Sequence, residues 1–323
     1  ETKPKIEAKE GELPRGVFVL PLGGTAPYDT VGTYFRDTEI TRLVEYIEEN
    51  YGLGQIIVLR IKSGGGYMHI WEKIRQAIYE ARPRHRFIAW IEFAGSAAAA
   101  SAYLCDEIYY LSKGECGAAT MYAGNLENPS PDWQQDGWAR ELAKVLAHSS
   151  HTPWIGGCMI RSKYNFSYDI DPETGEITYY PDESGDIVLS QTGRNMILTA
   201  GDALDCGLSD GTANTGEELA ALLDLDEWIE IDSFGRDIAA EWSETLKEFE
   251  EEGPKLMREF QGDVDATTPR KILSARIKAG QELLKWYDEI GEETWQLVAN
   301  RVRIEAIKRE IKDLEHQKSN LDD

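Results

Sequence analysis

Four short apolar runs alternate with amphipathic segments in the first third of the chain, and this alternation constrains the fold more than any other feature. The runs are GVFVLPLGG, QIIVLRI, RFIAWIEF and DEIYYL. Between the first three, residues 38–51 and 70–78 place apolar side chains at helical spacing. Buried strands that alternate with amphipathic helices indicate a parallel sheet with right-handed crossovers. We therefore predict an α/β fold.

The rest of the chain divides into segments of different composition. Residues 122–136 are rich in Asn, Pro, Asp and Gly and predict a loop, which a helix from about Trp138 to His148 follows. The run YNFSYDIDPETGEITYY alternates around a Pro-Glu-Thr-Gly turn and predicts a β-hairpin inserted at about residues 160–190. Further on, LTAGDALDCGLSDG has the pattern of a capped helix.

These segments predict three parts. Residues 1–15 form a polar leader, residues 16–232 form the core domain, and residues 233–323 form a helical C-terminal tail. The tail has almost no β character and is dense in Glu, Lys and Arg. Such a segment is typical of an arm that packs against a partner or forms an oligomer.

Charge and cysteine content exclude several functional classes. The chain has 34 Lys and Arg against 58 Asp and Glu, a net charge of -24, and no basic cluster with interleaved aromatics, so we do not expect nucleic acid as a partner. No apolar run reaches the roughly 20 residues of a transmembrane segment. The four cysteines lack CxxC spacing and nearby histidines, so we predict buried free thiols, or disulfides if the protein is exported, and no metal or cofactor. The compartment is left open between an exported or periplasmic location and the cytoplasm.

A serine stands where the strand RFIAWIEF runs into an alanine-rich helix. At such a junction the backbone holds Ser96 clear of the sheet, and the Ala97 amide would point at an oxyanion on an attacked carbonyl. The KSGGG turn after QIIVLRI permits positive φ and unobstructed N–H groups, as a second donor requires. Each element also has an ordinary structural role, since alanine-rich helices pack closely on sheets and glycine runs form turns.

Together, the strings IIVLRIKSGGG, FAGSAAAASAYLCDEIYYLSKGECGAAT and LTAGDALDCGLSDG resemble the ClpP-class serine peptidases of the ClpP/crotonase superfamily. This class includes the Clp proteolytic subunit, signal peptide peptidase A and NfeD-type membrane-associated proteases. The resemblance covers roughly residues 16–230. It implies a spiral of repeated βαβ units, here with an inserted hairpin and a helical extension, and a homo-oligomer that acts on peptides or proteins.

The resemblance also implies the residues that hold substrate and oxyanion. The family's Ser-Pro-Gly-Gly string matches residues 63–66, with glycine in place of proline. Gly65 is then one oxyanion donor, and Gly64 and Gly66 would bind the substrate backbone.

The nucleophile follows from a second spacing. In many family members it precedes an Asp-Glu-Ile strand by ten residues, and Asp106 lies ten residues after Ser96. This selects Ser96 rather than Ser101, with Ala97 as the second oxyanion donor.

The general base is implied less directly. The Clp subunit uses a histidine about twenty-five residues after the serine, but counting from Ser96 leads to Met121. Signal peptide peptidase A and NfeD-type enzymes use a lysine, whose amine becomes a base when burial lowers its pKa. Lys144, in ARELAKVLAHSS, resembles the lysine on the equivalent NfeD-type helix. Lys163 is the second candidate, followed by His148 and His151.

The leading prediction is a serine endopeptidase with an acyl-enzyme on Ser96 and Lys144 as the base. A catalytically inactive scaffold that assembles through its core and tail is the alternative, favoured by the missing proline and histidine and the unmatched tail. Acyl-CoA chemistry of the crotonase kind is a third reading, although the chain lacks a basic patch for the phosphates of CoA.

Overall fold

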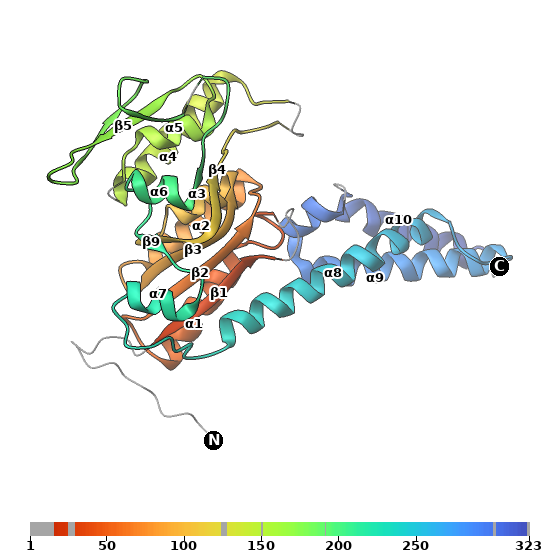
Figure 1. Cartoon of the computed structure of the whole chain (residues 1–323). Coiled ribbons are helices and arrows are strands. Elements are labelled where there is room, and N and C mark those ends of the chain that lie inside the picture. The colour runs from red at the N-terminus through yellow and green to blue at the C-terminus, as the bar shows by residue number, and fades with distance from the viewer. Residues whose placement is uncertain are drawn as a thin grey trace. The chain divides into compact units, whose positions relative to one another are not determined.

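The computed structural model describes residues 16–24, 30–123, 128–149, 151–190, 192–299 and 302–321 (Figure 1). The predicted polar leader, residues 1–15, lies outside the described residues. The fold is mixed α/β with a largely parallel sheet and a helical C-terminal extension, as the sequence predicts.

A six-stranded sheet forms the centre of the N-terminal part of the chain. Four parallel strands are hydrogen-bonded in chain order, and two short strands lie against the last of them, one antiparallel and one parallel. The strands are β1 (Val17–Gly23), β2 (Ile56–Ser63), β3 (Arg86–Gly95), β4 (Glu107–Gly117), antiparallel β8 (Ile197–Thr199) and β9 (Gly211–Thr212).

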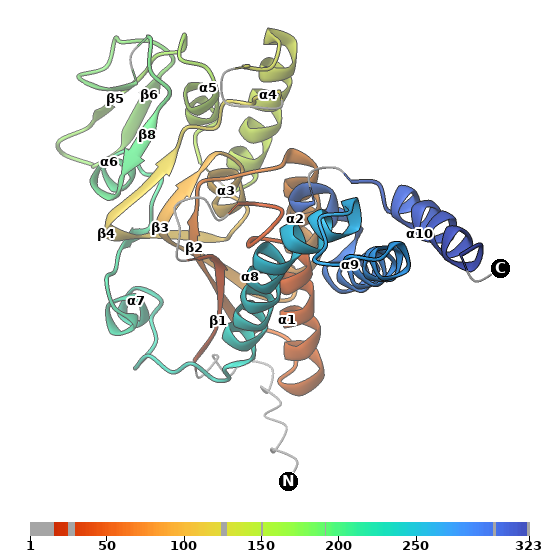
Figure 2. The same ribbon diagram turned by 90° about the vertical axis from the view of Figure 1, so that its right-hand side faces the viewer.

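Helices cover both faces of this sheet (Figure 2). One buried cluster joins alternate residues of the parallel strands to α1 (Asp37–Asn50), α2 (Met68–Ala81) and α3 (Ser96–Ala102). The intervening residues of the same strands point to the other face, where they form a second buried cluster with Leu219 of α7 (Gly216–Leu222). Because both faces are buried, the strands read as continuous apolar runs rather than alternating ones. A short helix, α6 (Ala200–Asp205), follows β8.

An insertion separates β4 from β8. It contains α4 (Asp132–His148), α5 (Trp154–Ile160) and an antiparallel sheet of β5 (Phe166–Ile170), β6 (Ile177–Tyr180) and β7 (Ile187–Ser190). The predicted hairpin is therefore present as β5 and β6, and β7 was not foreseen. The helix predicted from about Trp138 begins earlier, because Pro131 and the Asp132 carboxylate suit a helix N-terminus.

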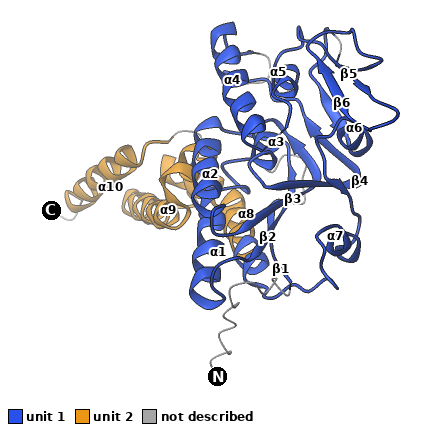
Figure 3. Ribbon diagram, turned by 90° about the vertical axis from the view of Figure 1, so that its left-hand side faces the viewer, with its two compact units in different colours: residues 1–239 blue, residues 240–323 orange. Residues whose placement is uncertain are grey.

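The chain divides into two compact units, Glu1–Ala239 and Ala240–Asp323 (Figure 3). The boundary falls inside α8 (Phe234–Gln261), which is followed by α9 (Pro269–Val298) and α10 (Ile304–Ser319). The second unit has aromatic packing of its own, since the Phe249 ring lies 5.6 Å from the rings of both Trp286 and Trp295. None of the helices in the described part of the chain has the length and apolarity that crossing a membrane requires. All four cysteines are buried free thiols.

Asp106 fixes the edge of the sheet at which β3 and β4 begin. Arg82, after α2, donates from Nε and Nη2 to Asp106 Oδ1 at 2.9 and 2.7 Å. The Phe87 N–H donates to Asp106 Oδ2 at 2.7 Å. One carboxylate therefore ties the end of α2 and the start of β3 to the residue before β4.

We expect Asp106→Asn to lower the free energy of unfolding by about 1–3 kcal/mol, because the charge-assisted bonds to Arg82 are lost. Urea denaturation measures this change. Asp132→Asn is the matched control, since that carboxylate pairs with Arg161 but is 83% exposed. Its effect should stay below about 1 kcal/mol, because an exposed carboxylate in the first turn of a helix contributes little. Equal effects of the two substitutions would contradict the anchoring role of Asp106.

Candidate functional site: the Ser96 turn

Ser96 occupies the sharp turn between β3 and α3. Its φ is +51°, a left-handed conformation that few residues other than glycine adopt. Gly95 before it is extended, so the chain reverses within two residues. The Ser96 side chain is half-buried, while the alanines that follow it are fully buried. A strained, accessible serine above a rigid sheet is the arrangement that an activated nucleophile requires.

The glycine turn after β2 lies directly against Ser96. β2 and β3 are paired up to Ser63 and Ala94, so the turns that follow the two strands lie side by side. A Cβ atom built on Gly65 would lie 2.4 Å from Ser96 Cβ and 3.0 Å from the Ala97 nitrogen. With a φ of +97°, Gly65 also has a backbone conformation that strains other residues. The structure thus brings Gly65, Ser96 and Ala97 together.

One edge of the glycine turn is already paired within the chain. The Val31 N–H donates to the Gly65 carbonyl at 2.8 Å, and the Tyr67 N–H donates to the Val31 carbonyl at 3.0 Å. Gly64 and Gly66 are exposed. An extended ligand therefore could not form hydrogen bonds to this edge of the turn. It would have to pair with the backbone groups that Val31 does not cover.

The Gly65 N–H has an internal acceptor. It donates to Ser63 Oγ at 3.2 Å, and Ser63 is 1% exposed. The Ala97 N–H belongs to the first turn of α3, where amides have no acceptor within the helix. Of the two predicted oxyanion donors, one is thus held by a neighbouring hydroxyl.

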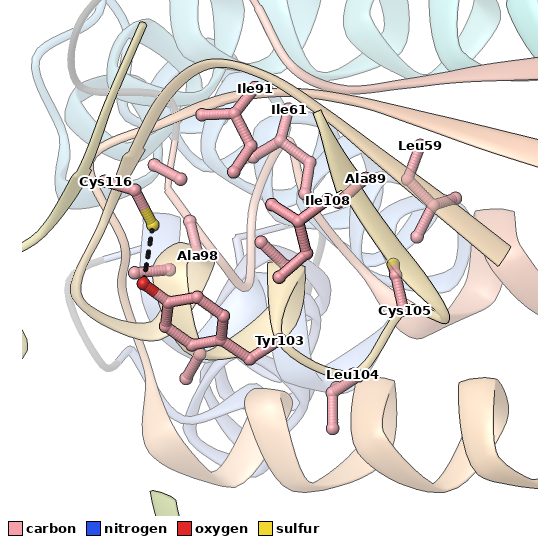
Figure 4. Packing of buried hydrophobic residues seen from close by; sticks show 14 of the residues in the cluster. Leu59, Ile61, Ala89, Ile91, Ala98, Tyr103, Leu104, Cys105, Ile108 and Cys116 are labelled. Carbon is pink, nitrogen blue, oxygen red and sulfur yellow. Dashed lines mark hydrogen bonds between the residues drawn. The ribbon is translucent and has the colours of Figure 1, made fainter. Parts of the chain in front are cut away.

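Close packing beneath the turn explains the alanine block (Figure 4). Ala98 and its neighbours are buried with Ile91 and Ile108, and larger side chains would push α3 away from the sheet. Tyr103 at the end of α3 and Cys116 of β4 share a hydrogen bond of 3.3 Å. Burial raises the pKa of the Cys116 thiol to about 11, so it remains protonated at neutral pH.

Two side chains of α4 hold the segment that leaves β4, and sequence reasoning gave neither of them this role. Gln135 is buried, and its amide accepts from the Met121 N–H at 3.0 Å and donates to the Met121 carbonyl at 2.6 Å. Trp138 donates from Nε1 to the Ala119 carbonyl at 2.9 Å. The sequence does place Gln135 on the same helix face as the apolar Trp138 and Leu142, which indicates a buried glutamine. Because Gly117 pairs with Gly95, this segment starts beside the Ser96 turn.

The two lysines lie on the surface. Lys144 Nζ is 2.7 Å from Glu141 Oε1 on the same helix, and 71% of its side chain is exposed. Lys163 is also exposed, with Nζ 5.2 Å from the centre of the Tyr164 ring. In the described part of the chain, neither amine is hydrogen-bonded to Ser96.

The two histidines are no nearer to this role. His148 is exposed beside Tyr79, with ring centres 5.2 Å apart. Burial lowers the pKa of His151, and the charge of Asp210 opposes that shift. Asp210 accepts the Ile108 N–H at 2.7 Å, at the edge where β4 begins, whereas Ser96 follows the opposite end of β3. The structure therefore does not bring His151 to the serine.

No protein-family model matches the sequence, and no curated protein matches it. Many solved structures share a likeness with the chain, including the three that follow. A mutant of the 1510-N membrane-bound stomatin-specific protease is 15% identical, over 65% of this chain and 86% of that chain, with a TM-score of 0.48. The 1510-N membrane protease specific for a stomatin homolog from Pyrococcus horikoshii is 15% identical, over 64% and 77%, with a TM-score of 0.42. ClpP1 from Listeria monocytogenes is 13% identical, over 61% and 91%, with a TM-score of 0.40. At these values the likeness assigns neither a function nor a residue role.

We expect Gly65→Ala to destabilise the fold more than Gly54→Ala. Gly54 also has positive φ, +80°, but an added Cβ there meets nothing within 4 Å. Its alanine variant should lose only the left-handed backbone preference, about 1–2 kcal/mol. Gly65→Ala adds the collision with Ser96, which should cost about 1–3 kcal/mol more. Equal midpoints of urea denaturation for the two variants would contradict the close approach.

Proposed function

We propose that the chain is a serine endopeptidase that cleaves peptide bonds through an acyl-enzyme on Ser96. The observation that carries the proposal is how closely the Gly65 backbone approaches Ser96. A Cβ atom added to Gly65 would lie 2.4 Å from the Ser96 Cβ atom and 3.0 Å from the Ala97 nitrogen. The Gly65 backbone, the Ser96 side chain and the Ala97 nitrogen therefore lie close together, and this closeness supports a site with backbone amides beside a serine, as acyl transfer needs.

In the proposed reaction, Ser96 Oγ forms a bond to the peptide carbonyl carbon while the base takes its proton. The negative charge that develops on the carbonyl oxygen is stabilised by the N–H groups of Gly65 and Ala97. The C–N bond then breaks as the base returns the proton to the leaving amine. Water hydrolyses the ester, which releases the acid and restores the serine hydroxyl.

The proposed substrate is an extended peptide or protein segment. Val31 fills one edge of the glycine turn, and Gly64 and Gly66 are exposed. A peptide strand that pairs with these two residues would be held by its backbone, and this predicts a broad side-chain preference. Assembly of several copies is part of the proposal, through the core and the helical extension.

Lys144 is the proposed proton acceptor. To act as one, its amine must be neutral and next to Ser96 Oγ, and burial is what favours the neutral form of a lysine. Lys144 would therefore have to leave Glu141 and water and move to Ser96. This movement is the most demanding requirement of the proposed mechanism.

A catalytically inactive peptide-binding scaffold is the second candidate. It is favoured by one observation: among the described residues, no amine, imidazole or carboxylate is hydrogen-bonded to Ser96. The glycine turn would then hold an extended peptide without cleaving it. Reactivity of Ser96 and peptide turnover, measured together, separate the two functions.

We expect a fluorophosphonate to label the wild-type chain and to leave Ser96→Ala unlabelled, since the reagent mimics the attacked carbonyl. Labelling is read by mass spectrometry of the intact chain. Ser101→Ala is the matched control, because the Ser101 hydroxyl is fully buried and donates to the Ala97 carbonyl at 2.8 Å. Its labelling should equal that of the wild type. Persistent labelling of Ser96→Ala would remove Ser96 as the nucleophile.

We expect Lys144→Ala to reduce hydrolysis of casein or a fluorogenic peptide by about 10²–10⁴-fold, the range for loss of a general base. Lys113→Ala, which removes another exposed lysine, should keep full turnover. Unchanged turnover in Lys144→Ala would move the role to Lys163 or a histidine. A wild type that is labelled at Ser96 but hydrolyses nothing would favour the scaffold.

A further inference from the structure

Ser63 is a buried hydroxyl that the proposed reaction does not use. It is the last residue of β2, is 1% exposed, and accepts the Gly65 N–H at 3.2 Å. A serine that accepts from the amide two residues ahead closes a local turn around that amide. Here the amide is the one proposed to stabilise the oxyanion.

The glycine turn needs such a constraint. Three consecutive glycines have almost no steric resistance to rotation of their peptide units. Rotation of the unit between Gly64 and Gly65 would replace the N–H with a carbonyl oxygen, which repels an oxyanion. The Val31 N–H binds the Gly65 carbonyl, which belongs to the next peptide unit, and the unit between residues 64 and 65 packs with its carbonyl against Gly95. Ser63 Oγ is the acceptor that fixes its orientation.

We propose that Ser63 is a positioning residue that acts through Gly65: its hydroxyl holds the peptide unit of residues 64 and 65 with the N–H available to the oxyanion. The proposal rests on the proposed function. A bond of 3.2 Å lies at the long end of the N–H···O range, so the same hydrogen can form a second, shorter bond to a charged acceptor. The oxyanion therefore gains a donor that is already oriented.

The position of Ser63 supports this role. Its backbone is paired with Ala94 of β3, two residues before Ser96, so the hydroxyl and the nucleophile are held by neighbouring strands. Gly65 is buried as well, and a buried N–H without an acceptor is strongly disfavoured. Loss of the hydroxyl should therefore shift the turn toward rotated forms.

The test compares Ser63→Thr with Ser63→Val in the full chain. Both add the same bulk at a buried position, and only threonine keeps the hydroxyl acceptor. We expect the valine variant to have kcat about tenfold or more below that of the threonine variant, since loss of a complete oxyanion donor costs about 10²–10³-fold. KM and the pH profile should be alike in the two, because Ser63 touches neither the substrate nor the base. Equal kcat values would overturn the proposal.

A second readout does not depend on turnover. Hydrogen exchange of the Gly65 amide, followed by NMR, should be faster in Ser63→Val than in Ser63→Thr. Equal exchange rates would overturn the proposal. If the wild type hydrolyses nothing while the exchange rates differ as expected, the positioning by Ser63 stands and the proposed endopeptidase activity fails.

Discussion

The pairing of β2 with β3 is the constraint on which the candidate site depends. The two strands remain paired to Ser63 and Ala94, after a shift of register between Ile61 and Lys62, so the glycine turn and the serine turn leave the sheet next to each other. Gly65 then meets Ser96 at a distance that no Cβ atom tolerates. The contact brings the Gly65 backbone against the Ser96 side chain and the backbone on either side of Ser96.

The surrounding core serves to keep that contact fixed. Alanines let α3 lie close to the sheet, and Asp106 fixes the opposite edge through Arg82 and Phe87. The insertion also supports the site, because Gln135 and Trp138 of α4 bind the backbone of the segment that follows β4. A turn with positive φ at a serine persists only where neighbouring packing over-determines it.

Much of this was readable from local patterns. Apolar runs and helical spacing predict the α/β core, and the alternation around DPETGE predicts β5 and β6. The strand β7 was missed because its side chains are largely exposed and its pairing partner, β5, is distant in sequence. The start of α4 was missed because proline and aspartate suit both loops and the first turn of a helix. The roles of Ser96, Gly65 and Lys144 stay predictions.

The sequence by itself determined which residues can take special conformations: glycines for the turn at 64–66, alanines for a close helix, and a serine between strand and helix. Only the tertiary structure decided which of these groups meet. It brought Gly65 against Ser96, and it placed the Trp138 side chain of α4 on the Ala119 carbonyl. Such meetings depend on strand register and helix packing across distant segments, and no local pattern of residues encodes them.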